Sequence, residues 1–277
     1  MDKVCIVVSK KCEVGKNILP IILELGNFKE CEVSFDGNKV YENENCYLAI
    51  CNELHIFAKN IDNAPGEKIV FLSTHKSEKS IKCFTVHPVG NFGKAMLGGK
   101  DFTLVKCSAL LNRALFNALR KFYEESNLKE EFLLSLEVTH HGPYAEKPIS
   151  FMEIGSTKEE WKNKEALEIL ANAVLEGIKN FYKMHRENFE IALCCGGNHY
   201  AAKFSRILQN KDNIAYGHLI AKYNLEKLNI ELFKEAVKKT IEGVNFVLMD
   251  KKGSTSLQRE KIKEFCKKLE IEFRQIK

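Results

Sequence analysis

Short apolar runs recur along the whole chain, and most have the length and the β-branched content of a buried strand. We predict strands at residues 4–9, 31–35, 47–51, 69–73, 132–140, 150–154, 189–194, 214–218, 245–249 and 271–275. Several of these runs are apolar on both faces, which is typical of a sheet that is covered by helices.

Segments with helical spacing of apolar residues separate the predicted strands. We predict helices at residues 15–25, 108–123, 158–184, 201–209, 232–242 and 254–269. Ser156 or Thr157 can cap the longest helix, and Glu159 and Glu160 then favour its dipole in the first turn. Ser254 can cap the last helix. Strands that alternate with helices predict an α/β fold. We expect a three-layer α/β/α sandwich around a mostly parallel or mixed central sheet, in one domain over residues 1–277, with residues 31–58 as a small β elaboration.

Composition narrows the class of protein. The chain has 277 residues, 45% of them hydrophobic and 29% charged, and no apolar run approaches the roughly 18–20 residues that span a bilayer. The N-terminus lacks the pattern of a signal peptide, so we expect a cytoplasmic protein without a membrane partner. The ten cysteines form no CxxC pair, so we expect most of them to be buried thiols.

The charge pattern allows a polyanionic partner without requiring one. The net charge is +5, and lysine is abundant whereas arginine occurs only six times. Lysine attracts backbone phosphates but does not read bases in bidentate fashion. Shape and charge should therefore matter more than base sequence if a nucleic acid binds.

Four polar segments follow predicted strands and contain most of the eight histidines. They are residues 73–77 with His75, residues 85–93 with His87, the pair His140–His141, and residues 194–204 with His199. Ligands of open α/β sheets bind beyond the carboxyl ends of strands, so these segments are candidates for one shared site.

The histidine pair needs a closer look, because side chains alternate along a strand. If the strand 132–140 stays regular, His140 and His141 point in opposite directions and at most one of them faces a reactive group directly. Alternation also places Glu137 on the face of His141. Glu153 follows on the next strand, and the resulting mixture of imidazole, carboxylate and hydroxyl is typical of a reaction site.

The segment CCGGNHY at residues 194–200 allows two interpretations. Gly196 and Gly197 permit a sharp turn and the close approach of a ligand, and Asn198 and His199 precede a predicted helix start that favours an anion. The same residues can simply form a strand-to-helix turn. We expect His55 and His185 to be structural, whereas His218 stays open. Zinc is compatible with dispersed His, Glu or Asp ligands.

The chain resembles a known family at these same segments. The matching stretches are STHKSE (73–78), TVHPVGNFG (85–93), LEVTHHGP (136–143), FMEIGSTKEEW (151–161) and GGNHYAAKF (196–204). They resemble the archaeal-type D-aminoacyl-tRNA deacylases, which plants share. The resemblance implies a zinc-dependent hydrolase that cleaves the ester between a D-amino acid and tRNA. It also implies a fold related to peptidyl-tRNA hydrolases and nucleoside phosphorylases.

The residues fit this chemistry, because ester hydrolysis needs an activated water and a group that stabilises charge on the carbonyl oxygen. We assign catalytic roles to His141 and Glu137 with His140 and His199, and we expect zinc ligands among His140, His141, His199 and Glu153. The substrate-binding candidates are His75, Lys76, His87, Asn91, Gly196, Gly197, Asn198 and Lys203, with amide donors from the Gly196–Gly197 turn. The expected partner is tRNA charged with D-amino acids, and no obligatory protein partner is evident. The alternatives are a peptidyl-tRNA hydrolase or nucleoside phosphorylase-like enzyme and a non-catalytic tRNA-binding protein.

Overall fold

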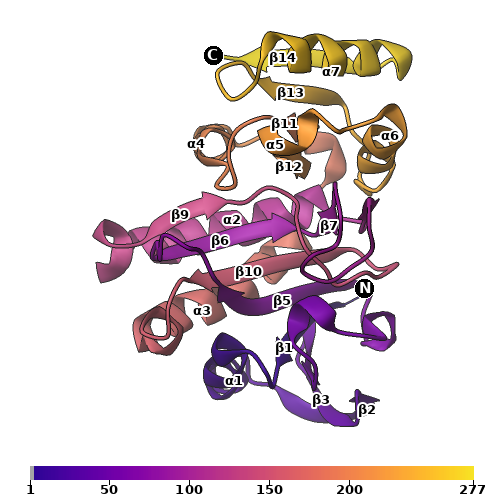
Figure 1. The fold of residues 1–277 in the computed structure, drawn as a ribbon. Coiled ribbons are helices and arrows are strands. Elements are labelled where there is room, and N and C mark those ends of the chain that lie inside the picture. Colours follow the sequence, from indigo (N-terminus) through magenta and orange to yellow (C-terminus); the bar gives the residue numbers. More distant parts are fainter. Residues whose placement is uncertain (1–2) are drawn as a thin grey trace.

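The computed structural model describes residues 3–277 (Figure 1). Its strands are β1 (Val4–Ser9), β2 (Lys29–Phe35), β3 (Asn38–Glu42), β4 (Cys46–Cys51), β5 (Lys68–His75), β6 (Cys83–Pro88), β7 (Gly90–Asn91), β8 (Thr103–Leu104), β9 (Leu133–Leu136), β10 (Ile149–Gly155), β11 (Glu190–Cys195), β12 (Ile214–Ile220), β13 (Phe246–Asp250) and β14 (Glu272–Ile276). Its α-helices are α1 (Glu13–Leu25), α2 (Ala109–Glu124), α3 (Lys164–Phe181), α4 (Ala202–Asn210), α5 (Lys222–Leu225), α6 (Ile230–Lys238) and α7 (Ser256–Lys268).

Two main sheets lie along the molecule. The larger has the order β2-β3-β4-β1-β5-β10-β6-β9, and the smaller has the order β12-β11-β13-β14 with every pair parallel. In the larger sheet β4, β1, β5 and β10 are parallel neighbours, and β6 runs antiparallel to β10. The predicted α/β class with a mixed sheet is confirmed. Residues 31–58 contribute the edge of the larger sheet through the antiparallel pairs β2–β3 and β3–β4.

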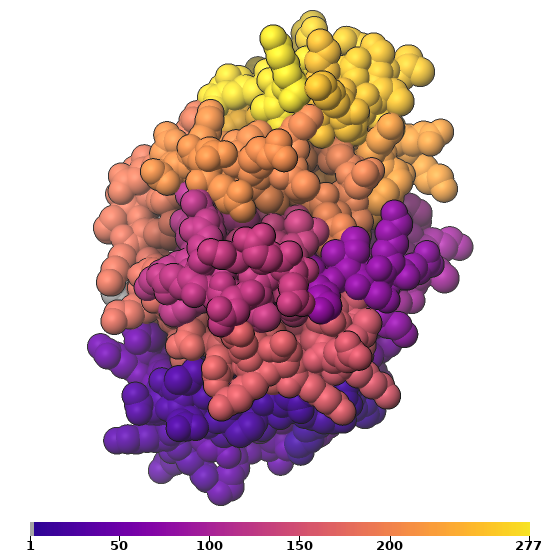
Figure 2. Space-filling view, turned by 90° about the vertical axis from the view of Figure 1, so that its left-hand side faces the viewer, coloured from indigo at the N-terminus to yellow at the C-terminus, as the bar shows by residue number. Residues whose placement is uncertain are grey.

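Helices cover one face of the larger sheet and both faces of the smaller one. Side chains of β1, β5, β6 and β10 that point to one face pack with α1, α2 and α3. The other face is covered mainly by loops and short 3₁₀ turns. On the smaller sheet, α4 packs on one face and α5, α6 and α7 on the other. The N-terminal and C-terminal segments lie at opposite ends of the molecule (Figure 2).

The predicted starts of two helices are wrong for local reasons. The helix predicted at 158–184 starts later, because Glu160 accepts the amides of Ser156 and Thr157 and forms a 3₁₀ turn with its neighbours. Asn163 then caps α3, which begins at Lys164. The last helix is capped by Thr255 in a capping box and not by Ser254.

Two strand predictions also change. Residues 85–88, predicted as a polar loop, belong to β6, where they pair with β10 and β9. The strand predicted at 132–140 ends at Leu136. The expectation for the cysteines holds, since nine of the ten are buried and all ten are free. Among residues 3–277, no helix is both long and apolar enough to cross a membrane.

Candidate active site

Strand alternation places a set of polar side chains on the loop-covered face of the larger sheet. Ser73 of β5 and Thr85 of β6 flank Glu153 of β10 in register, so the three side chains share one face. His75 and His87 lie two residues further along their strands and therefore on the same face. Residues that alternate with them along the strands, such as Leu72, Val86 and Met152, point to the helices on the opposite face. The site thus lies on a face of the sheet as well as at its strand ends.

The two adjacent histidines converge, contrary to the sequence prediction. The strand ends at Leu136, and His141 has a φ of +46°, so regular alternation does not extend to the pair. The ring centroids of His140 and His141 are 4.4 Å apart, and those of His140 and His87 are also 4.4 Å apart. Glu137 accordingly faces His75, His140 and His199 in place of its expected neighbour His141.

The segment with His199 joins the site through backbone hydrogen bonds. Val138 donates its amide to the carbonyl oxygen of His199 at 3.1 Å, and Glu137 forms an isolated bridge with Tyr200. Five imidazoles and two carboxylates thereby come together. We call them the His/Glu cluster, which comprises His75, His87, His140, His141, His199, Glu137 and Glu153.

Backbone carbonyls orient three of these imidazoles. In His87, His140 and His141, Nδ1 lies 2.5–3.1 Å from a backbone carbonyl oxygen. Nδ1–H is the donor in each case, so Nε2 of the neutral ring carries a lone pair. Burial, followed by the neighbouring imidazoles, lowers the pKa of His140 well below its usual value, and burial lowers the pKa of His141 to about 3. Both rings are therefore neutral at pH 7.

The two carboxylates lie among the imidazoles. Glu137 Oε1 is 3.0 Å from His75 Nδ1, and Glu137 Oε2 is 3.4 Å from His199 Nε2. Glu153 Oε2 is 3.3 Å from His75 Nδ1, while Ser73 donates its hydroxyl to Glu153 Oε1 at 2.5 Å. Although burial raises the pKa of Glu153, the hydrogen bond from His75 and the nearby imidazole of His87 lower it well below the usual value.

The cluster has the ligand atoms of a cation site, and some of these buried atoms lack hydrogen-bond partners. Neither carboxylate oxygen of Glu137 has a hydrogen-bond partner among residues 3–277, and Nε2 of His87 also lacks one, although all three atoms are buried. A buried carboxylate that accepts no hydrogen bond is costly, and a bound metal ion would compensate for this cost. Imidazole nitrogen and carboxylate oxygen are ligands that zinc prefers.

Three groups have ligand atoms that all lie within 4.8 Å of one another. They are His87 with His140 and His141, His75 with Glu137 and His199, and His87 with Glu137 and Glu153. The four expected ligands are divided among these groups, with His140 and His141 together in the first, His199 in the second and Glu153 in the third. His75 and His87, expected to bind substrate, and the expected catalytic residue Glu137 join them.

The cluster opens into a cavity of about 490 Å³. His140, His141, His199 and Glu153 line it together with Lys76, which was expected to bind substrate. The side chains of His199 and His140 are 35% and 21% exposed, so they are the most accessible imidazoles of the cluster.

The remaining substrate-binding candidates line a second depression. Gly197, Asn198 and Lys203 border a cavity of about 440 Å³ next to the cluster, with Lys222 and Lys252 also in its wall. Lys203 pairs with Asp250. Because His199 lines the first cavity and its neighbours Asn198 and Tyr200 line the second, the two cavities flank one short segment.

The glycine turn does not supply free amide donors. The φ values of +106° for Gly196 and +81° for Gly197 require glycine there. Gly196 donates its amide to Ile220 O at 2.8 Å, and Gly197 donates to Gly253 O at 2.9 Å. The prediction that this turn provides amides for a developing oxyanion is therefore wrong, because both amides already hold the loop in place.

Asn91 supports a loop at the edge of the cavity. Its Nδ2 donates to Gly98 O at 2.9 Å and to Lys100 O at 3.3 Å, which ties down the loop 92–102. This structural role replaces the substrate contact that was expected for Asn91. His218, left open by the sequence, is fully buried, and Thr139 donates its hydroxyl to His218 Nδ1 at 3.1 Å.

Sequence reasoning missed two polar residues of the site. The hydroxyl of Tyr200 forms a hydrogen bond with His75 Nε2 at 2.9 Å. Its position next to His199 is the only local sequence feature that indicates a place in the site. Ser73 orients Glu153, as described above. His55, expected to be structural, is buried in a 3₁₀ turn with its ring against Phe151, but it also lines the cavity.

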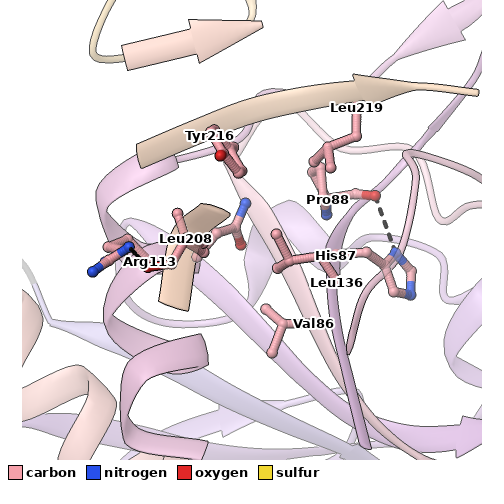
Figure 3. A pocket seen from close by; sticks show the side chains of 9 residues that line it. Val86, His87, Pro88, Arg113, Leu136, Leu208, Tyr216 and Leu219 are labelled. Atoms are coloured by element: carbon pink, nitrogen blue, oxygen red, sulfur yellow. Dashed lines mark hydrogen bonds between the residues drawn. The ribbon is translucent and has the colours of Figure 1, made fainter. Parts of the chain in front are cut away.

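A small internal cavity of about 10 Å³ lies between the two sheets, on the other side of the strand that carries His87 (Figure 3). Arg113, Leu208 and Tyr216 line it, and the His87 ring points away from it toward the Pro88 carbonyl. The residues around this cavity therefore support the strand of His87 from behind, and the larger cavity of about 490 Å³ lies beside the His/Glu cluster.

Comparison with known proteins agrees with this geometry. The sequence model of the D-aminoacyl-tRNA deacylase family matches residues 63–274. The chain belongs to this family. A D-aminoacyl-tRNA deacylase from Pyrococcus furiosus is 35% identical over 97% of this chain and 98% of its own length. Another deacylase, from Archaeoglobus fulgidus, is 36% identical over 94% of this chain and 91% of its own length.

A solved structure shares the whole fold. The crystal structure of a conserved protein of unknown function, AF0625, superposes with a TM-score of 0.88 at 34% identity and covers 99% of this chain and 95% of that chain. The two proteins therefore share this arrangement of two sheets over nearly the full length of the chain. The resemblance found in the five sequence segments is confirmed.

Proposed function

We propose that this chain hydrolyses the ester bond between a D-amino acid and the 3′ end of tRNA, which releases the free amino acid and recycles the tRNA. The observation that carries the proposal is the His/Glu cluster, which opens into a cavity of about 490 Å³. Membership of the D-aminoacyl-tRNA deacylase family supports this substrate class. Such a function implies work in the cytoplasm, where aminoacyl-tRNA is used.

We infer that the cluster binds zinc. The neutral imidazoles of His140 and His141, together with His87 Nε2 and the carboxylate oxygens of Glu137, which lack hydrogen-bond partners among residues 3–277, fit this ion. Carbonyl acceptors at Nδ1 are also the usual way in which proteins orient histidine ligands. A bound zinc ion acts as a Lewis acid and makes hydroxide available at neutral pH.

The chain's own side chains supply proton transfer and orientation. His199 is the most exposed imidazole of the cluster, and Glu137 lies 3.4 Å from its Nε2. This arrangement suits an imidazole that exchanges a proton with water or with the ribose oxygen that leaves in ester hydrolysis. Ser73 keeps Glu153 in place through its hydroxyl. Lys76 and the lysines of the second depression attract the phosphates of tRNA.

The decisive experiment compares release of tyrosine from D-tyrosyl-tRNA and L-tyrosyl-tRNA, with zinc content measured on the same samples. We expect hydrolysis of the D-form, loss of hydrolysis after chelation and recovery on addition of zinc. His140→Ala should lose both zinc and hydrolysis. The control His185→Ala should keep both, since the side chain of His185 is 68% exposed and lies outside the cluster.

Two results would contradict separate parts of the proposal. Zinc-loaded protein that leaves D-tyrosyl-tRNA intact would refute the activity, whereas full activity in zinc-free protein would refute the cofactor. N-acetyl-L-aminoacyl-tRNA, and nucleosides with phosphate, test the peptidyl-tRNA hydrolase and phosphorylase alternatives. If His140→Ala binds tRNA normally but does not hydrolyse it, a function in binding alone is excluded.

A further inference from the structure

The cavity next to the His/Glu cluster has apolar as well as polar residues in its lining. The apolar ones are Leu54, Ile56 and Leu97, which we call the apolar wall, and they line the same cavity as His140 and His199. A group attached one or two bonds from an ester carbonyl at the cluster therefore lies in the cavity that these three side chains border.

The apolar wall is built by two loops that lock together through backbone contacts. Gly142 donates its amide to Leu97 O at 3.0 Å, so the segment that carries His141 also holds Leu97. Gly98 has a φ of +77°, and a Cβ at this position would collide with Ile56 O. The position of Leu97 relative to the cluster is thus defined by the backbone and not by a free loop.

Leu97 is a large apolar side chain that folding leaves uncovered. It is 55% exposed although it lines the cavity, and its neighbour Met96 is 82% exposed without lining it. Contact with an apolar ligand removes the exposed surface of this leucine from water, which is favourable.

The distribution of charge separates the two ends of the substrate. The tRNA end is polyanionic, and the depression on the other side of the segment 198–200 has three lysines in its wall, Lys203, Lys222 and Lys252. The cavity with the apolar wall has the lysine Lys76 against the carboxylates of Glu78 and Glu153, whereas the depression has its three lysines against Asp250. Phosphates therefore favour the lysine-lined depression, and the apolar wall is left for the amino acid.

We propose that Leu54, Ile56 and Leu97 form the subsite for the side chain of the aminoacyl group, and that Leu97 sets a preference for large apolar and aromatic side chains. This inference rests on the proposed deacylase function. Beyond that function, it identifies the part of the substrate that the apolar wall contacts. A small side chain such as that of alanine reaches the cluster equally well but leaves the wall uncovered.

The test compares kcat/KM for D-tyrosyl-tRNA and D-alanyl-tRNA in three zinc-loaded variants. Leu97→Ala should lower kcat/KM for the tyrosyl substrate roughly ten-fold and leave the alanyl substrate within about two-fold, in line with what methylene groups contribute to hydrophobic pockets. Leu97→Trp fills the subsite and should again reduce tyrosyl turnover selectively. Met96→Ala is the matched control on the same loop and should change neither substrate.

Two outcomes would overturn the inference while the deacylase function stands. If Leu97→Ala reduces both substrates equally and also weakens inhibition by adenosine monophosphate, the wall binds the terminal adenine. If Met96→Ala and Leu97→Ala have the same effect, the loop acts as a whole and Leu97 has no specific contact. Wild-type protein that hydrolyses neither D-aminoacyl-tRNA would instead refute the proposed function, so the two failures are distinguishable.

Discussion

Two buried threonines next to the site offer a sharp test of the hydrogen-bond argument. Thr139 Oγ1 accepts the amide of Leu219 at 3.0 Å and donates to His218 Nδ1 at 3.1 Å, and Thr139 is 1% exposed. Thr85 is equally buried, but its hydroxyl has no partner among residues 3–277. Replacing either residue with valine keeps the shape and removes only the hydroxyl.

The two substitutions should change the free energy of unfolding differently. Thr139→Val leaves two buried polar groups without partners, each at a cost of about 1–3 kcal/mol, so we expect a destabilisation of about 2–6 kcal/mol. Thr85→Val removes a hydroxyl that already lacks a partner, so stability should stay the same or rise by about 1 kcal/mol. The two variants thereby separate the effect of lost hydrogen bonds on stability from the effect of altered packing.

Urea unfolding followed by circular dichroism measures both values, with each variant compared in the same zinc-free and zinc-saturated buffers. Zinc-free protein is the primary readout, because a bound ion adds its own contribution to stability. The reasoning is refuted if Thr85→Val destabilises the protein as much as Thr139→Val. Equal transition midpoints for Thr139→Val and wild type would refute it as well.

Three further predictions concern metal affinity, backbone strain and pH. Tyr200→Phe removes the hydroxyl on His75 Nε2 and should lower zinc affinity about 10–100-fold in a chelator competition, with the fold unchanged in circular dichroism. Gly98→Ala should destabilise the protein by at least about 2 kcal/mol in urea unfolding, because the new Cβ meets a backbone oxygen. Gly37→Ala, with a φ of +70° and no atom within 4 Å of its Cβ, should cost only about 1 kcal/mol. Glu160→Gln should cost about 1 kcal/mol at pH 7, since Glu160 accepts two backbone amides that lower its pKa against the effect of burial. Because the pKa of Glu160 is lowered in the folded state, its ionised carboxylate stabilises the fold above about pH 4.5, and this contribution is lost as the pH falls. The difference in the free energy of unfolding between Glu160→Gln and wild type should therefore shrink below about pH 4.

Most of the fold follows from local patterns. The apolar runs at 4–9, 69–73 and 150–154 became neighbouring strands of the larger sheet, because β-branched residues on both faces fit only a covered sheet. β6 was missed for the opposite reason. Its sequence CFTVHP contains a threonine and a histidine at alternate positions, and these polar residues look like a loop unless a buried site accounts for them.

The histidine pair shows where local reasoning stops. Alternation predicts opposite directions for His140 and His141 only as long as the strand continues, and the strand ends at Leu136 because of contacts from elsewhere in the chain. Glu137 bridges to Tyr200, and Thr139 donates its amide to Leu219 O. Both partners lie far away along the chain, so no window around the pair contains the information.

Register is the decisive non-local quantity for this site. Polar residues two positions apart, Ser73 with His75 and Thr85 with His87, are visible in the sequence as interruptions of apolar strands. They meet at Glu153 only because β10 lies between β5 and β6, with Ser73 and Thr85 in register on either side. A shift of one residue in either pairing would turn a full set of these side chains toward α1, α2 and α3. The apolar residues on the helix side therefore hold the register that assembles the cluster, and the core of the sheet is part of what makes the site possible.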